Sequence, residues 1–204
     1  MSEIVVTRWW WMRHAPVPGP EDLIKGKLDL PSDTSDSAAF AAQAARLPKG
    51  AAVVTSSRLR CRQTFAALVA AGLDVRPPEI EEGFDEQDFG TLAGRTWSEL
   101  KREAHPELES LWADPAHTKV PGGESFADLV TRVRPAIARV AARHVGGDIV
   151  VVAHGGTIRA ALAVALGLTP AQALLCSVGT LSLTRIDSIG AAWQVVATNR
   201  PPLG

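Results

Sequence analysis

The chain has 204 residues and a formal net charge of −1. This length suffices for one domain with a sizeable buried core, and the balanced charge gives no general electrostatic reason to bind nucleic acid or an anionic membrane. The two cysteines are too few for a disulfide framework, and we find neither a signal peptide nor an apolar run long enough to span a bilayer. We expect a single cytoplasmic domain over residues 1–204, with its oligomeric state left open.

The first predicted element is a strand beginning at residue 4. Its apolar and aromatic side chains leave no polar face, which is typical of a strand at the centre of a sheet covered on both sides. The strand must stop at Ala15-Pro16, because proline lacks a donor for the sheet and restricts the residue before it. Arg13 and His14 are thereby placed at the carboxyl end of a central strand, where open α/β sheets bind their ligands.

The middle of the chain alternates short regular elements with irregular ones. Proline, glycine and aspartate predict a long loop over 15–36. The regular elements predicted after it are a helix over 36–47, a strand over 51–55, a helix over 59–71, a strand over 73–77, and helices over 96–104 and 106–112. We expect the irregular segments near 15–36 and 79–123 to face the substrate.

The C-terminal part contains the longest helix and the clearest strand. A helix over 125–144 begins with an approximate capping box, and Pro135 within it should bend or break it. The strand over 148–153 runs directly into His154-Gly155-Gly156 and a helix over 157–166. The last two strands, 180–187 and 191–197, read as a hairpin.

Alternating strands and helices of this kind predict an α/β fold. We expect a three-layer α/β/α sandwich with a mainly parallel central sheet and an antiparallel C-terminal edge. In a parallel sheet the carboxyl ends of neighbouring strands share one edge, so His14, His154 and the arginines after residue 55 should meet there.

These residue types suit a phosphate group. Guanidinium groups bind phosphate oxygens in a bidentate manner. The helix starts at Ser56–Arg60 and at Gly155-Gly156-Thr157 add free backbone N–H groups and the positive end of a helix dipole. The sequence therefore predicts a site for a tetrahedral dianion.

The motifs of this site resemble those of the histidine phosphatase superfamily, also called phosphoglycerate-mutase-like. Five motifs occur in the family's order: Arg13-His14-Ala15 for Arg-His-Gly; Arg60 in the pattern ending at Gln63-Thr64; Glu86 before Gly90 and Gly94; Gly123-Glu124-Ser125; and His154-Gly155-Gly156. The loop from Gly26 to Pro31 also resembles that of α-ribazole phosphatase relatives.

The resemblance implies a role for each matching residue. His14 would attack phosphorus and form a phosphohistidine, which splits one difficult displacement into two easier ones. Arg13, Arg60 and His154 would hold the phosphoryl oxygens, with Gly155 and Thr157 also contacting the substrate. Glu86 would protonate the leaving alcohol and then activate water. The resemblance implies no cofactor and no metal ion, since the arginines supply the positive charge.

The sequence alone leaves the roles of some residues undecided. Ala15 replaces the family glycine, and the asparagine that many members carry downstream has no clear counterpart. Arg58 and Arg62 compete with Arg60, and four acidic neighbours compete with Glu86; only the motif spacing chooses between them. Lys25, Lys27 and Lys119 lie in the irregular segments, where each either meets an anionic group of the substrate or stays solvated.

The predicted function is hydrolysis of a small-molecule phosphomonoester through a phosphohistidine. Two alternatives remain: phosphoryl transfer of the phosphoglycerate mutase type, and a module that binds a phosphorylated ligand without catalysis. The mutase alternative calls for strong carboxylate anchors, and the loops carry no additional arginine cluster.

Overall fold

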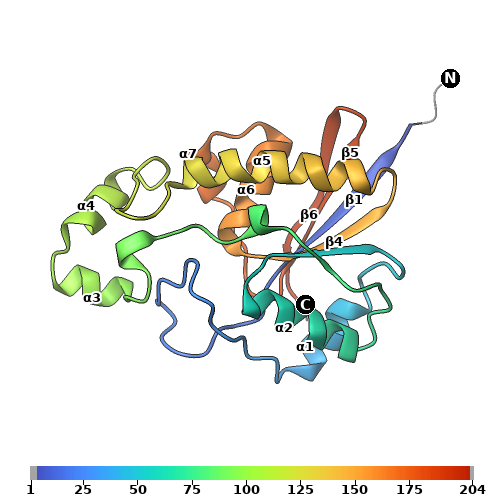
Figure 1. Cartoon of the computed structure of the whole chain (residues 1–204), viewed down its shortest axis with the longest axis horizontal. Helices are drawn as coiled ribbons and strands as arrows, with labels where there is room; N and C mark the ends of the chain where they lie inside the picture. Colours follow the sequence, from blue (N-terminus) through green and yellow to red (C-terminus); the bar gives the residue numbers. More distant parts are fainter. Residues whose placement is uncertain (1–3, 203–204) are drawn as a thin grey trace.

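The computed structural model describes residues 4–202 (Figure 1), so that residues 1–3 and 203–204 of the expected domain lie outside the described residues. Within these residues, six strands form one sheet in the order β3-β2-β4-β1-β5-β6. The strands are β1 (Val6–Arg13), β2 (Ala52–Thr55), β3 (Glu79–Ile80), β4 (Asp148–Ala153), β5 (Leu183–Ile189) and β6 (Ala192–Arg200). The helices are α1 (Ser37–Ala44), α2 (Leu59–Ala70), α3 (Trp97–Arg102), α4 (Pro106–Ala113), α5 (Phe126–Arg143), α6 (Gly155–Leu166) and α7 (Pro170–Leu174).

The sheet is mixed in the way the sequence predicts. Strand β1 runs parallel to β4, β4 to β2, and β2 to β3, whereas β5 and β6 continue antiparallel from β1. Helices α1 and α2 lie on one face of the sheet, and α5, α6 and α7 lie on the other (Figure 1). The prediction of a three-layer α/β/α sandwich with an antiparallel C-terminal edge is confirmed.

The tryptophan run in β1 packs on both faces of the sheet, because successive side chains of a strand point to opposite faces. Trp9 and Trp11 are almost fully buried under α5 and α6, with ring centroids 5.7 Å apart. Trp10 lies on the other face, where its Nε1 donates to Asp148 Oδ1 at 2.9 Å and Arg185 covers its ring. These side chains therefore serve the core, as expected.

A smaller third core anchors the first long loop. Helices α3 and α4 lie at one end of the molecule (Figure 1), where Leu92, Leu100 and Leu108 pack around Ile24 of the 15–36 loop. Ile24 N also donates to Arg95 O at 2.8 Å. The loop is thus irregular, as predicted, but fixed in place.

The strand predicted over 73–77 is absent, and that prediction is wrong. The edge strand forms over Glu79–Ile80, where Val54 pairs with Glu79 and Thr55 with Ile80. The two prolines at 77 and 78 supply no N–H to a neighbouring strand, so regular pairing begins only after them.

Two helix predictions also need correction. Helix α6 begins at Gly155 rather than at residue 157, so His154 is its N-cap residue and both glycines lie in the first turn. Helix α5 is continuous over Phe126–Arg143 and does not break at Pro135, since its buried apolar stripe holds it against the sheet. Its predicted capping box, Ser125 with Asp128, is present. None of the helices formed within residues 4–202 is both long and apolar enough to cross a bilayer.

Candidate active site

The two predicted site histidines lie side by side at the carboxyl edge of the sheet. His14 follows β1 and His154 follows β4, and these strands are parallel neighbours with Arg13 paired to Ala153. The ring centroids of the two histidines are 5.2 Å apart, with an interplanar angle of 62°. Strand β2 lies on the other side of β4 and delivers Ser56 to the same edge.

His14 is held as a neutral ring with one nitrogen free. Its Nδ1 lies 2.7 Å from the carbonyl oxygen of Ala15, so the proton belongs on Nδ1 and the lone pair on Nε2. The ring is nearly fully buried, and burial, reinforced by the charges of Arg60 and Arg13, lowers the pKa of His14 to about 3. At neutral pH, Nε2 is therefore an unprotonated nucleophile.

The alanine after His14 fits without strain. Ala15 is fully buried in the core cluster that contains Met12 and Phe40. Its N–H donates to Thr64 Oγ1 at 2.9 Å, and this hydroxyl donates to Arg60 O at 2.7 Å. The methyl group that distinguishes this chain from the family pattern thus points into the core, away from the site.

Arg13 presents an unused donor at the site. Its Nη1 donates to Val178 O at 2.6 Å, whereas its buried Nε has no hydrogen-bond partner among the described residues. Burial is the main cause that lowers the pKa of Arg13, opposed by the charge of Glu86 and assisted by Arg159 and Arg60. A buried N–H without a partner is costly, so an anion in this site would be stabilised.

Arg60 is the arginine that enters the site. It is fully buried, and its Nη1 and Nη2 donate to the carbonyls of Leu28 and Gly26 at 2.6 and 2.7 Å. Each of these nitrogens keeps a second N–H for an anion. Arg58 instead pairs with Asp85 at 2.6 Å, and Arg62 lies 3.9 Å from Asp29. The geometry therefore agrees with the choice of Arg60.

His154 bridges Arg60 and Ser56. Arg60 Nε donates to His154 Nδ1 at 3.2 Å, so the ring proton resides on Nε2, which lies 2.7 Å from Ser56 Oγ. Burial, followed by the charges of Arg60 and His14, lowers the pKa of His154 well below its usual value. In this arrangement the ring orients Arg60, and it reaches a phosphoryl oxygen only by exchanging one of these two hydrogen bonds.

Glu86 differs from the neighbouring acidic residues in its hydrogen-bond partners. Glu86 Oε1 accepts from Gly156 N at 3.1 Å, which places its carboxylate at the start of α6. A Cβ at Gly156 would lie 2.4 Å from the same oxygen, so this approach requires glycine. Asp85, in contrast, is nearly fully buried and bound to Ser57 and Arg58.

The remaining predicted contacts, Gly155 and Thr157, lie in the first turn of α6. The Thr157 hydroxyl is buried 3.1 Å from the carbonyl oxygens of both Phe84 and Asp85, where it holds the segment that carries Glu86. A Cβ built on Gly155 would meet Arg13 Nε at 3.6 Å, an ordinary contact. Thr157 thus supports the segment that carries Glu86, and substrate contacts by Gly155 and Thr157 stay predictions.

Sequence reasoning missed Arg159, and it placed Ser56 only at a helix start without the contact that its hydroxyl makes with His154. Ser56 belongs to the motif that contains Arg60, but only the folded chain reveals its hydrogen bond to His154. Arg159 is one turn beyond Gly155 on α6, the spacing at which helix side chains share a face. Its Nε donates to Cys176 O at 2.7 Å, and its charge contributes to the lowered pKa of Arg13.

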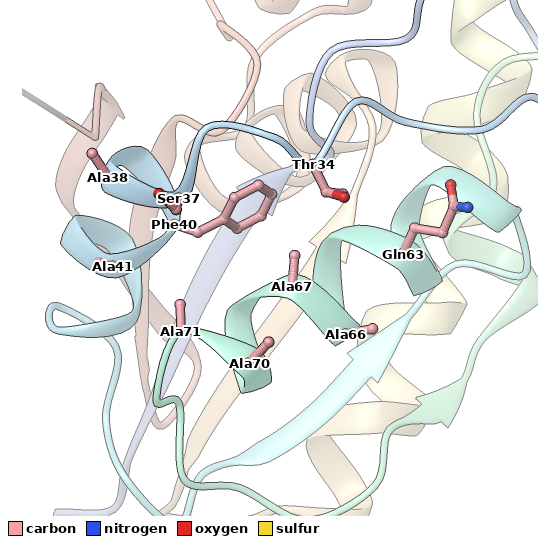
Figure 2. Close-up of a pocket in the computed structure, with 10 residues that line it drawn as sticks. All are labelled: Thr34, Ser37, Ala38, Phe40, Ala41, Gln63, Ala66, Ala67, Ala70 and Ala71. Carbon is pink, nitrogen blue, oxygen red and sulfur yellow. The ribbon is translucent and has the colours of Figure 1, made fainter.

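A cavity of about 430 Å³ opens at this edge of the sheet. Its lining consists of Arg13, His14, Pro16, Val17, Glu21, Lys25 and Thr180. A larger cavity of about 800 Å³ lies between α1 and α2 (Figure 2), but alanine side chains line most of it and no site residue does. Of the predicted site residues, Arg13 and His14 line the smaller cavity.

Neutral buried histidines make the stability of the protein depend on pH. The folded-state pKa of His14, about 3, lies below the ordinary value of 6.5, so the unfolded chain binds the proton more readily between these limits. We expect the unfolding free energy to fall as pH drops from 6.5 toward 3, by up to about 1.4 kcal/mol per pH unit for this histidine.

Urea unfolding of the wild type and of His14→Gln between pH 4.5 and 7.5 measures this dependence. The stability of the wild type relative to the variant should decline as pH falls below 6.5 and should be constant above it. A difference that stays constant through this range would show that His14 does not change its pKa on folding.

Comparison with known proteins agrees with the motifs. The family model of the histidine phosphatase superfamily (branch 1) matches residues 9–201, and the chain belongs to this family. The chain is 34% identical, over 145 residues, to a bifunctional protein of Mycobacterium tuberculosis, a match that covers 70% of this chain and 39% of that protein. It is 34% identical, over 121 residues, to a 2,3-bisphosphoglycerate-dependent phosphoglycerate mutase of Methylobacterium radiotolerans, covering 58% of this chain and 57% of the mutase.

Solved structures share the whole architecture. A mycobacterial glucosyl-3-phosphoglycerate phosphatase superposes with a TM-score of 0.81 at 25% identity, covering 96% of this chain and 99% of that one. A putative α-ribazole-5′-phosphate phosphatase of Escherichia coli superposes with a TM-score of 0.84 at 23% identity, covering 97% and 98% of the two chains. The latter likeness shows the fold alone. The chain spans less than two thirds of the length of the sequence relatives named above.

Proposed function

We propose that this protein is a phosphatase that hydrolyses a small phosphomonoester through a phosphohistidine on His14. The observation that carries the proposal is a neutral His14 with a free Nε2, which lines one cavity with Arg13 and whose pKa is lowered by burial and by the nearby charge of Arg60. Likeness over nearly the full chain to a glucosyl-3-phosphoglycerate phosphatase supports the same reaction class.

In the first step, the lone pair of His14 Nε2 attacks phosphorus as the bond to the leaving alcohol oxygen breaks. The unpaired N–H groups of Arg13 and Arg60 stabilise the charge on the equatorial oxygens, where the charge of the transition state is spread. Glu86 donates its proton to the leaving oxygen. The hydrogen bond from His14 Nδ1 to Ala15 keeps the ring oriented while positive charge develops on it.

In the second step, water attacks the phosphoryl group on the side the alcohol has left. The Glu86 carboxylate, held at the start of α6 by Gly156 N, accepts a proton from this water. The bond between phosphorus and His14 Nε2 then breaks and inorganic phosphate is released. This step restores the neutral histidine and the protonated glutamic acid.

Turnover of p-nitrophenyl phosphate in excess EDTA tests the function. Because Arg13 and Arg60 supply the positive charge, we expect p-nitrophenol and inorganic phosphate to form in equal amounts at an undiminished rate. Absence of turnover would favour a module that binds phosphorylated ligands without catalysis. Turnover that EDTA abolishes would point to a metal-dependent hydrolase.

The similarity to phosphoglycerate mutases supports a second candidate function. This function is transfer of the phosphoryl group between two hydroxyls of a sugar acid. Incubation with 3-phosphoglycerate separates the two: a phosphatase releases inorganic phosphate, whereas a mutase forms 2-phosphoglycerate without net release. We propose the phosphatase because the described loops place Lys25 at the cavity but no group of arginines around a carboxylate site.

We also propose that the protein acts in the cytoplasm on a small molecule rather than on a nucleic acid. Cys61 and Cys176 are unpaired thiols, as suits a reducing compartment. The net charge of −1 offers no general attraction for a polyanion.

A further inference from the structure

The Gly123-Glu124-Ser125 motif contacts the chain that carries Glu86. Glu124 N donates to Asp88 O at 2.8 Å, and Asp88 N donates to Glu124 Oε1 at 3.1 Å. A Cβ at Gly123 would clash with Asp88 O, so this close approach requires glycine. The first two residues of the motif therefore fix the backbone two positions after Glu86.

Arg132 of α5 binds the backbone before Glu86 and at Glu86 itself. Its Nη1 donates to Gly83 O at 2.9 Å and to Asp85 O at 3.2 Å. Its Nη2 donates to Glu86 O at 3.3 Å and also to Asp85 O at 3.2 Å. Residues 85–89 lie in no helix or strand. The arginine therefore supplies hydrogen bonds that regular secondary structure would otherwise supply.

Glu124 orients Arg132 for these contacts. Arg132 Nη2 lies 2.6 Å from Glu124 Oε1, and Arg132 Nε donates to Glu124 Oε2 at 3.2 Å. Two parallel hydrogen bonds of this kind fix the plane of a guanidinium group as well as its position. Both side chains are largely buried. The ion pair thus joins the contacts before Glu86 to those after it.

The backbone of Glu86 depends on this arginine. Among the described residues, the one hydrogen bond to a backbone group of Glu86 is the bond from Arg132, whereas the carboxylate accepts from Gly156 N. A displacement of about 1 Å in a catalytic group can cost about 10²-fold in rate. We infer that Arg132, oriented by Glu124, is the positioning residue that holds Glu86 for proton transfer to the leaving group. The inference rests on the proposed phosphatase function and deepens it.

Two esters of similar shape test the inference. Phenyl phosphate needs a proton on its leaving oxygen more than p-nitrophenyl phosphate does, and kcat/KM is measured for both with the wild type, Arg132→Met and Glu86→Gln. We expect Arg132→Met to lower kcat/KM for phenyl phosphate by about 10- to 100-fold more than for p-nitrophenyl phosphate. In the Glu86→Gln background, Arg132→Met should add no further leaving-group dependence, because the two residues act as a unit.

Arg139→Met is the matched control. Arg139 lies two turns after Arg132 on α5, with its Nη2 2.7 Å from Glu81 Oε1, and its guanidinium donates to Glu81 alone within the described chain. It should keep the wild-type ratio of the two esters. Arg132→Lys keeps a positive charge beside Glu124 but has no planar fork. This variant should show the selective loss in smaller measure, and it carries the test if Arg132→Met does not fold.

Amide hydrogen exchange measured by NMR separates this inference from the proposed function. The N–H of Gly156 lies in the first turn of α6, where no helix carbonyl can accept it, so its protection reports on the Glu86 carboxylate. Exchange at Gly156 should be about 10-fold or more faster in Arg132→Met and unchanged in Arg139→Met.

The outcomes divide as follows between the inference and the reaction. Equal losses for both esters in Arg132→Met, or unchanged exchange at Gly156, would overturn the inference while leaving the phosphatase reaction intact. Protection of Gly156 that depends on Arg132, in a wild type that hydrolyses neither ester, would support the positioning of Glu86 and contradict the proposed reaction.

Discussion

Replacing His14 with alanine should lower kcat for p-nitrophenyl phosphate by about 10⁴-fold or more, because the variant has no nucleophile to form the covalent intermediate. Direct attack by water would have to pass the full barrier in one displacement, without the covalent intermediate that divides it into two easier steps. Steady-state kinetics at neutral pH measures the effect, and circular dichroism shows whether the variant is folded.

His117→Ala is the matched control. His117 is an exposed histidine whose Nδ1 lies 3.1 Å from Asp114, outside the cavity. Its loss should leave kcat within about twofold of the wild type, as is usual for surface substitutions. Residual activity of His14→Ala above a tenth of the wild-type value would mean that another group attacks phosphorus.

The second large effect is expected from Glu86→Gln, and its size should depend on the leaving group. A glutamine cannot donate a proton, so kcat/KM for an alkyl phosphate such as glycerol 3-phosphate should fall by about 10²–10⁴-fold. p-Nitrophenolate leaves without protonation, so its ester should lose much less in the first step. Equal losses for the two esters would count against Glu86 as the acid.

Two glycine variants test the position of Glu86 without removing it. The methyl group of Gly156→Ala would meet Glu86 Oε1 at 2.4 Å and displace the carboxylate, whereas that of Gly155→Ala would meet nothing nearer than 3.6 Å. Gly156→Ala should therefore reproduce the leaving-group dependence of Glu86→Gln, and Gly155→Ala should not. The idea fails if the two variants behave alike.

The sheet and the meeting of the two histidines were predictable because they depend on local patterns. A run such as Ile149–Ala153 is short, rich in β-branched residues and without a polar face, which favours a buried strand, and His-Gly-Gly directly after it predicts a helix start. Once two such strands are parallel neighbours, their terminal residues must share an edge. The meeting of His14 and His154 was therefore predictable on the condition that their strands are parallel neighbours, as β1 and β4 are.

Pairing at the sheet edge was not predictable from the same patterns. Residues 73–77 have strand composition, yet the pair of prolines delays pairing until Glu79–Ile80. A strand of two residues carries no periodicity that could reveal it. The partner strand determines its position.

The contact partners of individual side chains were also not predictable from the sequence. Nothing in the sequence distinguishes Asp85 from Glu86 by chemistry, and their difference arises from the contacts of Asp85 with Arg58 and of Glu86 with Gly156. The same holds for Lys25 and Lys27, which lie on one loop two residues apart. Only long-range packing decides which of them meets a carboxylate, and Lys27 Nζ lies 3.7 Å from Asp88.

The most direct test of the central claim is to trap the covalent intermediate. The protein is mixed with an excess of p-nitrophenyl phosphate, quenched in alkali, in which phosphohistidine is stable, and digested for mass spectrometry. The phosphoryl group should be found on His14, attached at Nε2, because Nδ1 is bound to the carbonyl of Ala15. A phosphoryl group on any other residue, or an unmodified His14 under conditions of rapid turnover, would contradict the account.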